Sequence, residues 1–206
     1  MNKVKKYSTA FSAGALMVNE AEAVISRINN PEGIFRGDEK LDYSTIPVNS
    51  ESSKKRLGSE LKKRLLSLGN PILLNEYISG SKDDKKLILF YSICKAYQLI
   101  ADFMIEVVLR KWNQLDREIG NDDFKNYLYR KMDQDTDLEN LTPETIKRRS
   151  GITIQMLKEL GMIKDGKLQK KEFNPSILRR IAANGDEWFL EVLLLNESER
   201  NEIIQR

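Results

Sequence analysis

Residues 87–109 read LILFYSICKAYQLIADFMIEVVL, a long and almost uninterrupted apolar run. Its length would suffice for a bilayer-spanning helix, which needs about 20 apolar residues. However, Lys95, Asp102 and Glu106 lie well inside it. Each charge near the centre of a bilayer costs roughly 2.5 to 3.5 kcal/mol, which outweighs the gain from the apolar side chains. We therefore expect a buried helix of a soluble bundle, in which Asp102 has a partner such as a basic residue or a helix N-terminus.

Start and stop signals on both sides of this run predict further helices. Ser81, with aspartates in the first turn, starts the central helix, which we expect to continue to about residue 117. Asp165-Gly166 lies between two short segments of strand character and is typical of a β-hairpin turn. The other helices are expected at about residues 8–29, 50–68, 71–78, 121–132, 143–161 and 174–183.

The predicted fold class is mainly α: a compact helical bundle with helix-turn-helix or winged-helix-like units and one short β-hairpin. We expect three regions, packed together as one compact unit. They are an N-terminal helical, helix-turn-helix-like region at residues 1–70, a central long-helix core at 71–120 and a C-terminal winged-helix-like region at 121–206.

The composition argues against an enzyme. The 206 residues include no histidine, which removes the commonest general base, the Ser-His and Cys-His nucleophile systems and the histidine-containing zinc sites. The single cysteine, Cys94, excludes an internal disulfide and fits a reducing, cytoplasmic location. It lies inside the apolar run, so we expect a small buried side chain rather than a reactive thiol. No phosphate-binding glycine loop or metal cluster is visible, and neither a cofactor nor a metal is expected.

Charge is separated along the chain, although the net charge is only +3. Residues 52–68 carry six basic residues and one acid, and residues 142–180 carry ten basic residues and four acids. Residues 116–141 and 185–206 carry a net charge of −4 each. Basic blocks of this kind favour a polyanion partner, with protein contacts elsewhere, and scattered solvated charge is the alternative.

The first basic block, SSKKRLGSELKKRLLSL, is predicted to form an amphipathic helix. At about 100° per residue its inner stripe consists of Leu57, Leu61, Leu65 and Leu68. Cations mixed with small hydroxyl side chains on the opposite face suit a helix that approaches a DNA duplex. An ordinary solvated surface is the alternative. The residues expected to contact DNA are Ser52, Lys55, Arg56, Ser59, Lys62 and Lys63.

The second basic block is predicted to form a helix followed by a basic hairpin. The expected inner seam consists of Ile146, Ser150, Thr153, Leu157 and Leu160, and Ile152 faces outward for no evident reason. A helix followed by a basic two-stranded wing is the layout of a winged-helix reader of DNA, and an ordinary surface helix with a hairpin is the alternative. The expected DNA contacts are Lys147, Arg148, Gln155 and Lys158 on the helix, and Lys167, Lys170 and Lys171 on the wing.

An acidic loop follows a calcium-binding template at Asp133, Asp135, Asp137, Glu139 and Glu144. Leu138 occupies the position where the sharp turn of such a loop needs glycine. Helix capping and solvation account for the same acids, so we do not expect calcium binding here.

The beginning of the sequence, MNKVKKYSTAFSAGALMVNEAEA, imitates a signal peptide. Its apolar stretch is weak, because Ser12 and Gly14 interrupt it and Asn19 ends it. An amphipathic helix starting near Ser8 is the better interpretation.

Four stretches, in this order and at this spacing, resemble the BrxA family of small accessory proteins of bacteriophage exclusion (BREX) defence systems. They are YSTAFSAGALMVNEAEAV, SSKKRLGSELKKRLLSL, YSICKAYQLIADFMIEVV, and TIKRRSGITIQMLKELGMIKDGKLQ with the following NPSILRRIA. The resemblance implies a mainly helical, winged-helix or related protein that binds DNA beside a methyltransferase, an ATPase and other defence components. None of the four stretches is a catalytic signature, so the DNA-contacting residues named above come from the helical faces alone.

Together these observations predict a non-enzymatic, double-stranded DNA-binding accessory protein of a BREX system, cytoplasmic and without a membrane partner. One alternative is a helical scaffold for protein partners in the same complex, suggested by the acidic blocks and the apolar segment WFLEVLLL near the end of the sequence. A second alternative is RNA binding through the same basic faces.

Overall fold

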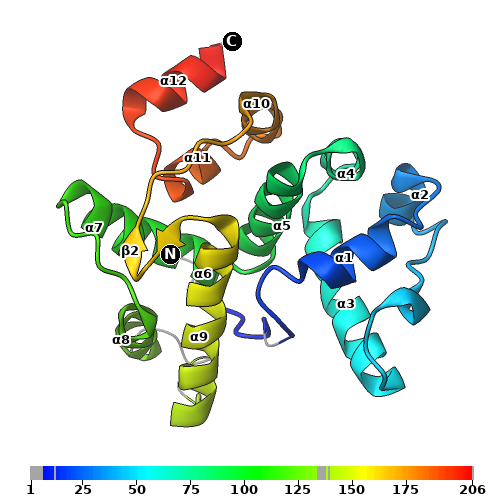
Figure 1. The fold of residues 1–206 in the computed structure, drawn as a ribbon, viewed down its shortest axis with the longest axis horizontal. Helices are drawn as coiled ribbons and strands as arrows, with labels where there is room; N and C mark the ends of the chain where they lie inside the picture. Colours follow the sequence, from blue (N-terminus) through cyan, green and yellow to red (C-terminus); the bar gives the residue numbers. More distant parts are fainter. Residues whose placement is uncertain (1–6, 12, 134–137, 139, 206) are drawn as a thin grey trace, which may run out of the picture.

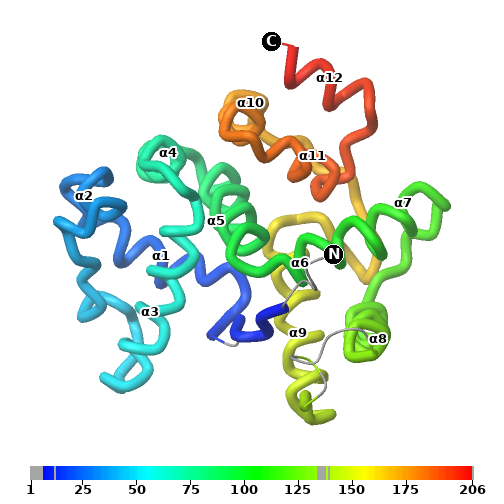
Figure 2. Tube along the Cα trace, turned by 180° about the vertical axis from the view of Figure 1, so that it is seen from behind, coloured from blue at the N-terminus to red at the C-terminus, as the bar shows by residue number. Residues whose placement is uncertain are grey.

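The apolar run at residues 87–109 forms the centre of the fold as two helices instead of one. The computed structural model describes residues 7–11, 13–133, 138 and 140–205 (Figure 1). α5 covers Lys82–Ala96, and α6 at Gln98–Phe103 continues through the π-helical segment η2 at Met104–Leu109 into α7 at Arg110–Asn113. The two parts are bent by 105° (Figure 2). The prediction of one continuous helix over residues 81–117 is therefore wrong.

Tertiary packing of Tyr97 explains the break, since no proline or glycine lies there. Tyr97 has φ −136° and ψ 86°, outside the helical region. Its N–H donates to the Ile93 carbonyl at 2.8 Å and its carbonyl accepts from the Ile100 N–H at 2.9 Å, so the break leaves both groups satisfied. The fully buried side chain donates its hydroxyl to Glu60 Oε2 at 2.6 Å and packs its ring edge-on against Phe11.

The remaining elements are mainly helical, as predicted, and are joined by short connections. Ser50 caps α3 and Thr142 caps α9, each accepting from the N–H three residues later, as the sequence indicated. In chain order they are α1 at Val18–Ile25, α2 at Pro31–Arg36, the 3₁₀ turn η1 at Tyr43–Thr45, α3 at Glu51–Ser67, α4 at Ile72–Ser79, α8 at Asn121–Met132, α9 at Pro143–Leu160, β1 at Ile163–Lys164, β2 at Lys167–Leu168, α10 at Pro175–Ala183, α11 at Trp188–Val192 and α12 at Glu197–Gln205.

The predicted N-terminal helix is shorter than expected, because its first half is held in a non-helical conformation. The described residues before Val18 form no helix, and Met17 adopts a left-handed conformation with φ 60°. The guanidinium of Arg64 in α3 donates to the carbonyls of Gly14 and Ala15 at 3.1 and 2.7 Å. These bonds occupy carbonyl groups that a helix would use, so a contact with α3 overrides the amphipathic pattern. We call residues 8–11 and 13–17 the bridging segment.

The hairpin is extended by a third segment. β1 and β2 pair antiparallel, and Asp165 and Gly166 both have positive φ, at 52° and 75°, as a type I′ turn requires. Glu118 then forms an antiparallel bridge with Lys167, and the Ile119 N–H donates to the Gly166 carbonyl at 3.0 Å. The chain order from α6 is thus helix, extended segment, α8, α9 and hairpin.

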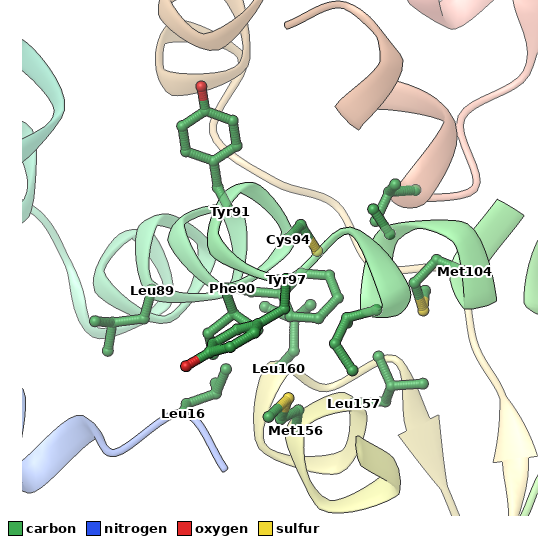
Figure 3. Packing of buried hydrophobic residues seen from close by; sticks show 14 of the residues in the cluster. Leu16, Leu89, Phe90, Tyr91, Cys94, Tyr97, Met104, Met156, Leu157 and Leu160 are labelled. Atoms are coloured by element: carbon green, nitrogen blue, oxygen red, sulfur yellow. The ribbon is translucent and has the colours of Figure 1, made fainter. Parts of the chain in front are cut away.

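The buried apolar side chains form a single cluster in which α5 meets α3, α9 and the bridging segment (Figure 3). Figure 3 shows Leu157 and Leu160 of α9 in the same cluster as Phe90 and Cys94 of α5, with Leu16 beside Tyr97. All members of the two predicted inner seams are buried. Residues on both sides of positions 70 and 120 contribute to this cluster, and the division into three regions stays a prediction.

Two buried carboxylates fasten the elements together. Asp102 accepts hydrogen bonds from the Tyr7 hydroxyl at 2.7 Å and the Gln98 side chain at 2.6 Å, so it has the partner that its burial requires. Asp186, between α10 and α11, accepts from Lys95 at 2.6 Å and from the Trp188 indole at 2.8 Å. Burial alone would raise the pKa of Asp186, but these hydrogen bonds outweigh it and lower the pKa below its usual range.

Candidate nucleic-acid interface

The exposed face of α3 carries the predicted cations. The four leucines of its stripe are buried, so the helix turns the opposite face outward. Lys55, Arg56 and Lys62 form no ion pair with any described residue. All six predicted contact residues are exposed: Ser52, Lys55, Arg56, Ser59, Lys62 and Lys63.

One basic residue of the same block, Arg64, is internal. Its side chain is fully buried, with Nε donating to Glu60 Oε1 at 2.6 Å and the other nitrogens donating to the bridging segment. Glu60 also accepts the Tyr97 hydroxyl, so it connects α3 to the break between α5 and α6. The i, i+4 spacing of Glu60 and Arg64 was the sequence signal for this pair.

The helices α3 and α9 both contact the bridging segment, through Arg64 and Glu159 respectively. The Lys63 ammonium lies 4.1 Å from the centre of the Tyr97 ring, which packs at 5.4 Å from the ring of Phe11. The Arg149 guanidinium of α9 lies 5.3 Å from the centre of the Phe11 ring. The Leu16 N–H donates to Glu159 of α9 at 3.0 Å. In Figures 1 and 2 the chain before α1 runs between α3 and α9. Two helices far apart in sequence are thereby joined through one shared strip of chain.

The outward face of α9 carries the second set of predicted contacts. Lys147 and Lys158 are exposed and form no ion pair with a residue that the structure describes. Arg148 and Gln155 are also exposed, and the Gln155 amide donates to Glu159 at 3.1 Å. The helix therefore offers cations and an amide on one surface, as phosphate contact requires.

A shallow hollow of about 730 Å³ lies over this face. Its lining includes Lys147, Gly151, Ile152 and Gln155 of α9, together with Ala15 and Asn121. Ile152 is half-buried here, which accounts for the apolar residue that the helical pattern left facing outward.

Arg149 is a site residue that the sequence did not single out. Its Nε and Nη1 atoms are buried and have no hydrogen-bond acceptor among the described residues. Burial, followed by the neighbouring charge of Arg148, lowers the pKa of Arg149. Buried guanidinium nitrogens without an acceptor are unfavourable, so these two atoms of Arg149 lose hydrogen bonds that water would otherwise supply.

The predicted wing lysines divide into two groups. Lys167 is exposed on β2, close to the turn. Lys170 forms an ion pair with Glu199 of α12, and Lys171 forms one with Asp83 of α5 at 2.9 Å. Beyond β2 the chain runs back towards these helices, so Lys170 and Lys171 fasten the hairpin to the body of the molecule, and the structure does not gather them with Lys147 and Lys158.

The structure adds no support for calcium binding, for a reactive cysteine or for an exposed apolar segment near residue 190. Asp135, Asp137 and Glu139 of the calcium template lie outside the residues that the structure describes. Within the described residues, no three or more possible metal ligands form a group. Cys94 is completely buried, and burial raises the pKa of its thiol. The segment WFLEVLLL is largely core, because Phe189, Leu190 and residues 192–194 are buried, while Trp188 and Leu195 are partly buried against the same cluster.

No single helix in the described part of the chain is long and apolar enough to cross a membrane. The bent pair of α5 with α6–α7 meets the criteria of length and composition only when its two parts are taken together.

Comparisons with known proteins agree with the sequence resemblance. The sequence model of the BrxA family matches residues 5–185. The BREX protein BrxA of Bacillus cereus (strain H3081.97) is 26% identical over 199 residues, which cover 94% of this chain and 99% of that protein. The crystal structure of an uncharacterized protein from Magnetospirillum magneticum shares the fold, with a TM-score of 0.75 at 19% identity over 92% of this chain and 98% of the other. The chain belongs to the BrxA family.

Proposed function

We propose that this protein is a non-enzymatic component of a BREX defence system that binds double-stranded DNA. Membership of the BrxA family, and the BREX protein among its relatives, support the first half of the proposal. The observation that carries the second half is that two helices joined through the bridging segment, α3 and α9, both carry exposed cations that form no ion pair with a described residue. These cations are Lys55, Arg56, Lys62, Lys147 and Lys158.

The order of elements supports α9 as the helix that meets the duplex. A helix, an extended segment, two further helices and a hairpin is the connectivity of a winged-helix unit, whose last helix enters the major groove. We infer that α6 to β2 form such a unit, with α9 in the major groove and the turn at Asp165-Gly166 as a short wing. Lys167 would then reach the DNA backbone beside the groove, while Lys170 and Lys171 would keep their ion pairs.

Contacts of this kind are mostly to phosphates, so base readout is limited. Lys147, Lys158, Lys55 and Lys62 present flexible point charges, and Gln155 is the one candidate base-reading side chain with a planar amide among the predicted α9 contacts. We therefore expect binding with weak sequence preference and strong salt dependence. Other BREX components, such as the methyltransferase and the ATPase, would contact the remaining surface, including the acidic helix α12.

Fluorescence anisotropy with a random-sequence duplex of about 20 base pairs tests the proposal, because a specific or non-specific duplex binder responds at low salt. Lys147→Glu with Lys158→Glu should abolish binding, since two attractive contacts become repulsive. Lys170→Glu with Glu199→Lys, which exchanges the members of an existing ion pair, is the matched control and should bind normally.

A structured RNA hairpin serves as competitor in the same assay. If RNA displaces the duplex at an equal or lower concentration, the basic faces serve RNA instead. If the unsubstituted protein leaves the duplex unbound at low salt, the acidic blocks and a scaffold role become the better explanation.

A further inference from the structure

Gly151 occupies the middle of α9, where glycine is an unfavourable choice. Glycine destabilises a helix interior relative to alanine, because it loses more backbone freedom on folding. The backbone of Gly151 is helical and lacks the positive φ that would require glycine. Apart from its chain neighbours and the backbone of α9 itself, a Cβ atom built at this position meets no described atom within 4 Å. Neither packing within the described structure nor backbone conformation explains the residue.

The helix α3 shows what an internally required glycine looks like. Gly58 is buried, and a Cβ atom there would overlap the ring of Tyr43 from η1. Gly58 thus lets two elements of the same chain approach closely. Gly151 likewise allows another group to approach the helix backbone closely, but no described part of the protein occupies that space.

The exposed side chains on either side of Gly151 along α9 are of the kind that contact phosphate. Lys147 precedes it by one turn, Gln155 follows by one turn, and all three line the hollow over α9. Arg148 lines the same hollow, and Lys158 lies two turns along this face. Two carboxylates, those of Glu144 and Glu159, also line the hollow, but Glu159 is occupied by the Leu16 N–H and the Gln155 amide.

We propose that Gly151 is the point of closest approach between α9 and the sugar-phosphate backbone of duplex DNA. The missing side chain lets the DNA backbone sit in the hollow against the helix, with Lys147 and Gln155 on either side. This inference rests on the proposed function and adds to it the position at which the protein and DNA backbones come closest.

A size series at this one position separates the contact from folding. Gly151→Ala should raise the melting temperature by about 2 to 4 °C, because alanine is the better helix former. Affinity for the random duplex should nevertheless fall by about 5-fold with alanine and by up to about 100-fold with leucine, the range that overfilling a packed contact produces. Asn201→Leu, which adds the same side chain to the exposed face of α12, should leave affinity unchanged.

Thermal unfolding and fluorescence anisotropy give the two readouts. A stabilised Gly151→Ala together with a Gly151→Leu that binds like the unsubstituted protein overturns the inference and leaves DNA binding intact. A lower melting temperature for Gly151→Ala also overturns it, because the glycine would then serve the helix itself. Failure of the proposed function itself is distinguishable from both outcomes, because the unsubstituted protein would then not bind the duplex.

Discussion

Removing two unpaired cations from α3 should lower both the affinity for DNA and its dependence on salt. Lys55 and Lys62 lie two turns apart on the exposed face, and neither is paired with a described carboxylate. We expect the double variant Lys55→Ala, Lys62→Ala to fold normally, since each substitution removes an exposed side chain from a helix and replaces it with the best helix former.

The magnitude follows from counterion release. Each phosphate neutralised contributes about −0.9 to the slope of log K against log salt, so losing two contacts should reduce the slope by about 1.8. The same relation, referred to 1 M salt, gives an affinity loss of about 60-fold at about 0.1 M salt. Anisotropy titrations with a random duplex at several salt concentrations measure both quantities.

The matched control removes the same charge from lysines that are already paired. Lys170→Ala with Lys171→Ala also lowers the net charge by two, but their ammonium groups face Glu199 and Asp83. We expect little change in slope for this variant. If both double variants reduce the slope equally, total charge and not the α3 face determines binding. If neither does, α3 does not touch the duplex.

Three further predictions concern the body of the protein. Arg64→Ala should lower the free energy of unfolding by about 3 to 5 kcal/mol in urea titrations, because it leaves the buried carboxylate of Glu60 without its cation. A loss below about 1 kcal/mol, the value of a surface ion pair, would show that this pair does not behave as a buried one. The pKa of Asp186 is lowered in the folded state, so its contribution to stability is present above the unfolded pKa of about 4 and is lost as the pH falls below that value. Asp186→Asn should flatten this acid dependence of the free energy of unfolding, measured by urea titrations across the same pH range. A pH profile like that of the unsubstituted protein would contradict the prediction. Cys94 should resist thiol reagents in the native protein and react at once in denaturant, whereas rapid native labelling would show that α5 opens readily.

Local patterns in the sequence were enough for most of the helices and for both inner seams. The stripe of leucines in α3 and the seam of α9 follow the helical period, and the caps at Ser50 and Thr142 and the Asp165-Gly166 turn depend on neighbours only a few residues away. Such signals are local, so a single sequence contains them.

The errors come from contacts between distant residues. Nothing near Tyr97 predicts the break, which depends on Glu60 and Phe11. The bridging segment has a helical pattern but is held open by Arg64. Such partners lie far away in sequence, and periodicity within one segment does not reveal them.

The candidate site was predicted to a similar degree. Which side chains point outward could be inferred from helical faces, and every predicted contact on α3 and on α9 is exposed. The ion pair of Lys170 with Glu199 could not be inferred, because it depends on where α12 folds back onto the molecule. Arg149 was missed for the same reason, since its burial arises only when Phe11 packs beside it.

The bridging segment has a consequence for how the protein is made. The hydrogen bond from Leu16 to Glu159 joins residues 143 positions apart, whereas the contacts from Arg64 to the same segment span about a third of that distance. During synthesis α3 emerges from the ribosome before α9, so the bridging segment can bond Arg64 first and can reach Glu159 only after α9 has been translated. The bridging segment therefore has to wait for α9 before its second anchor can form.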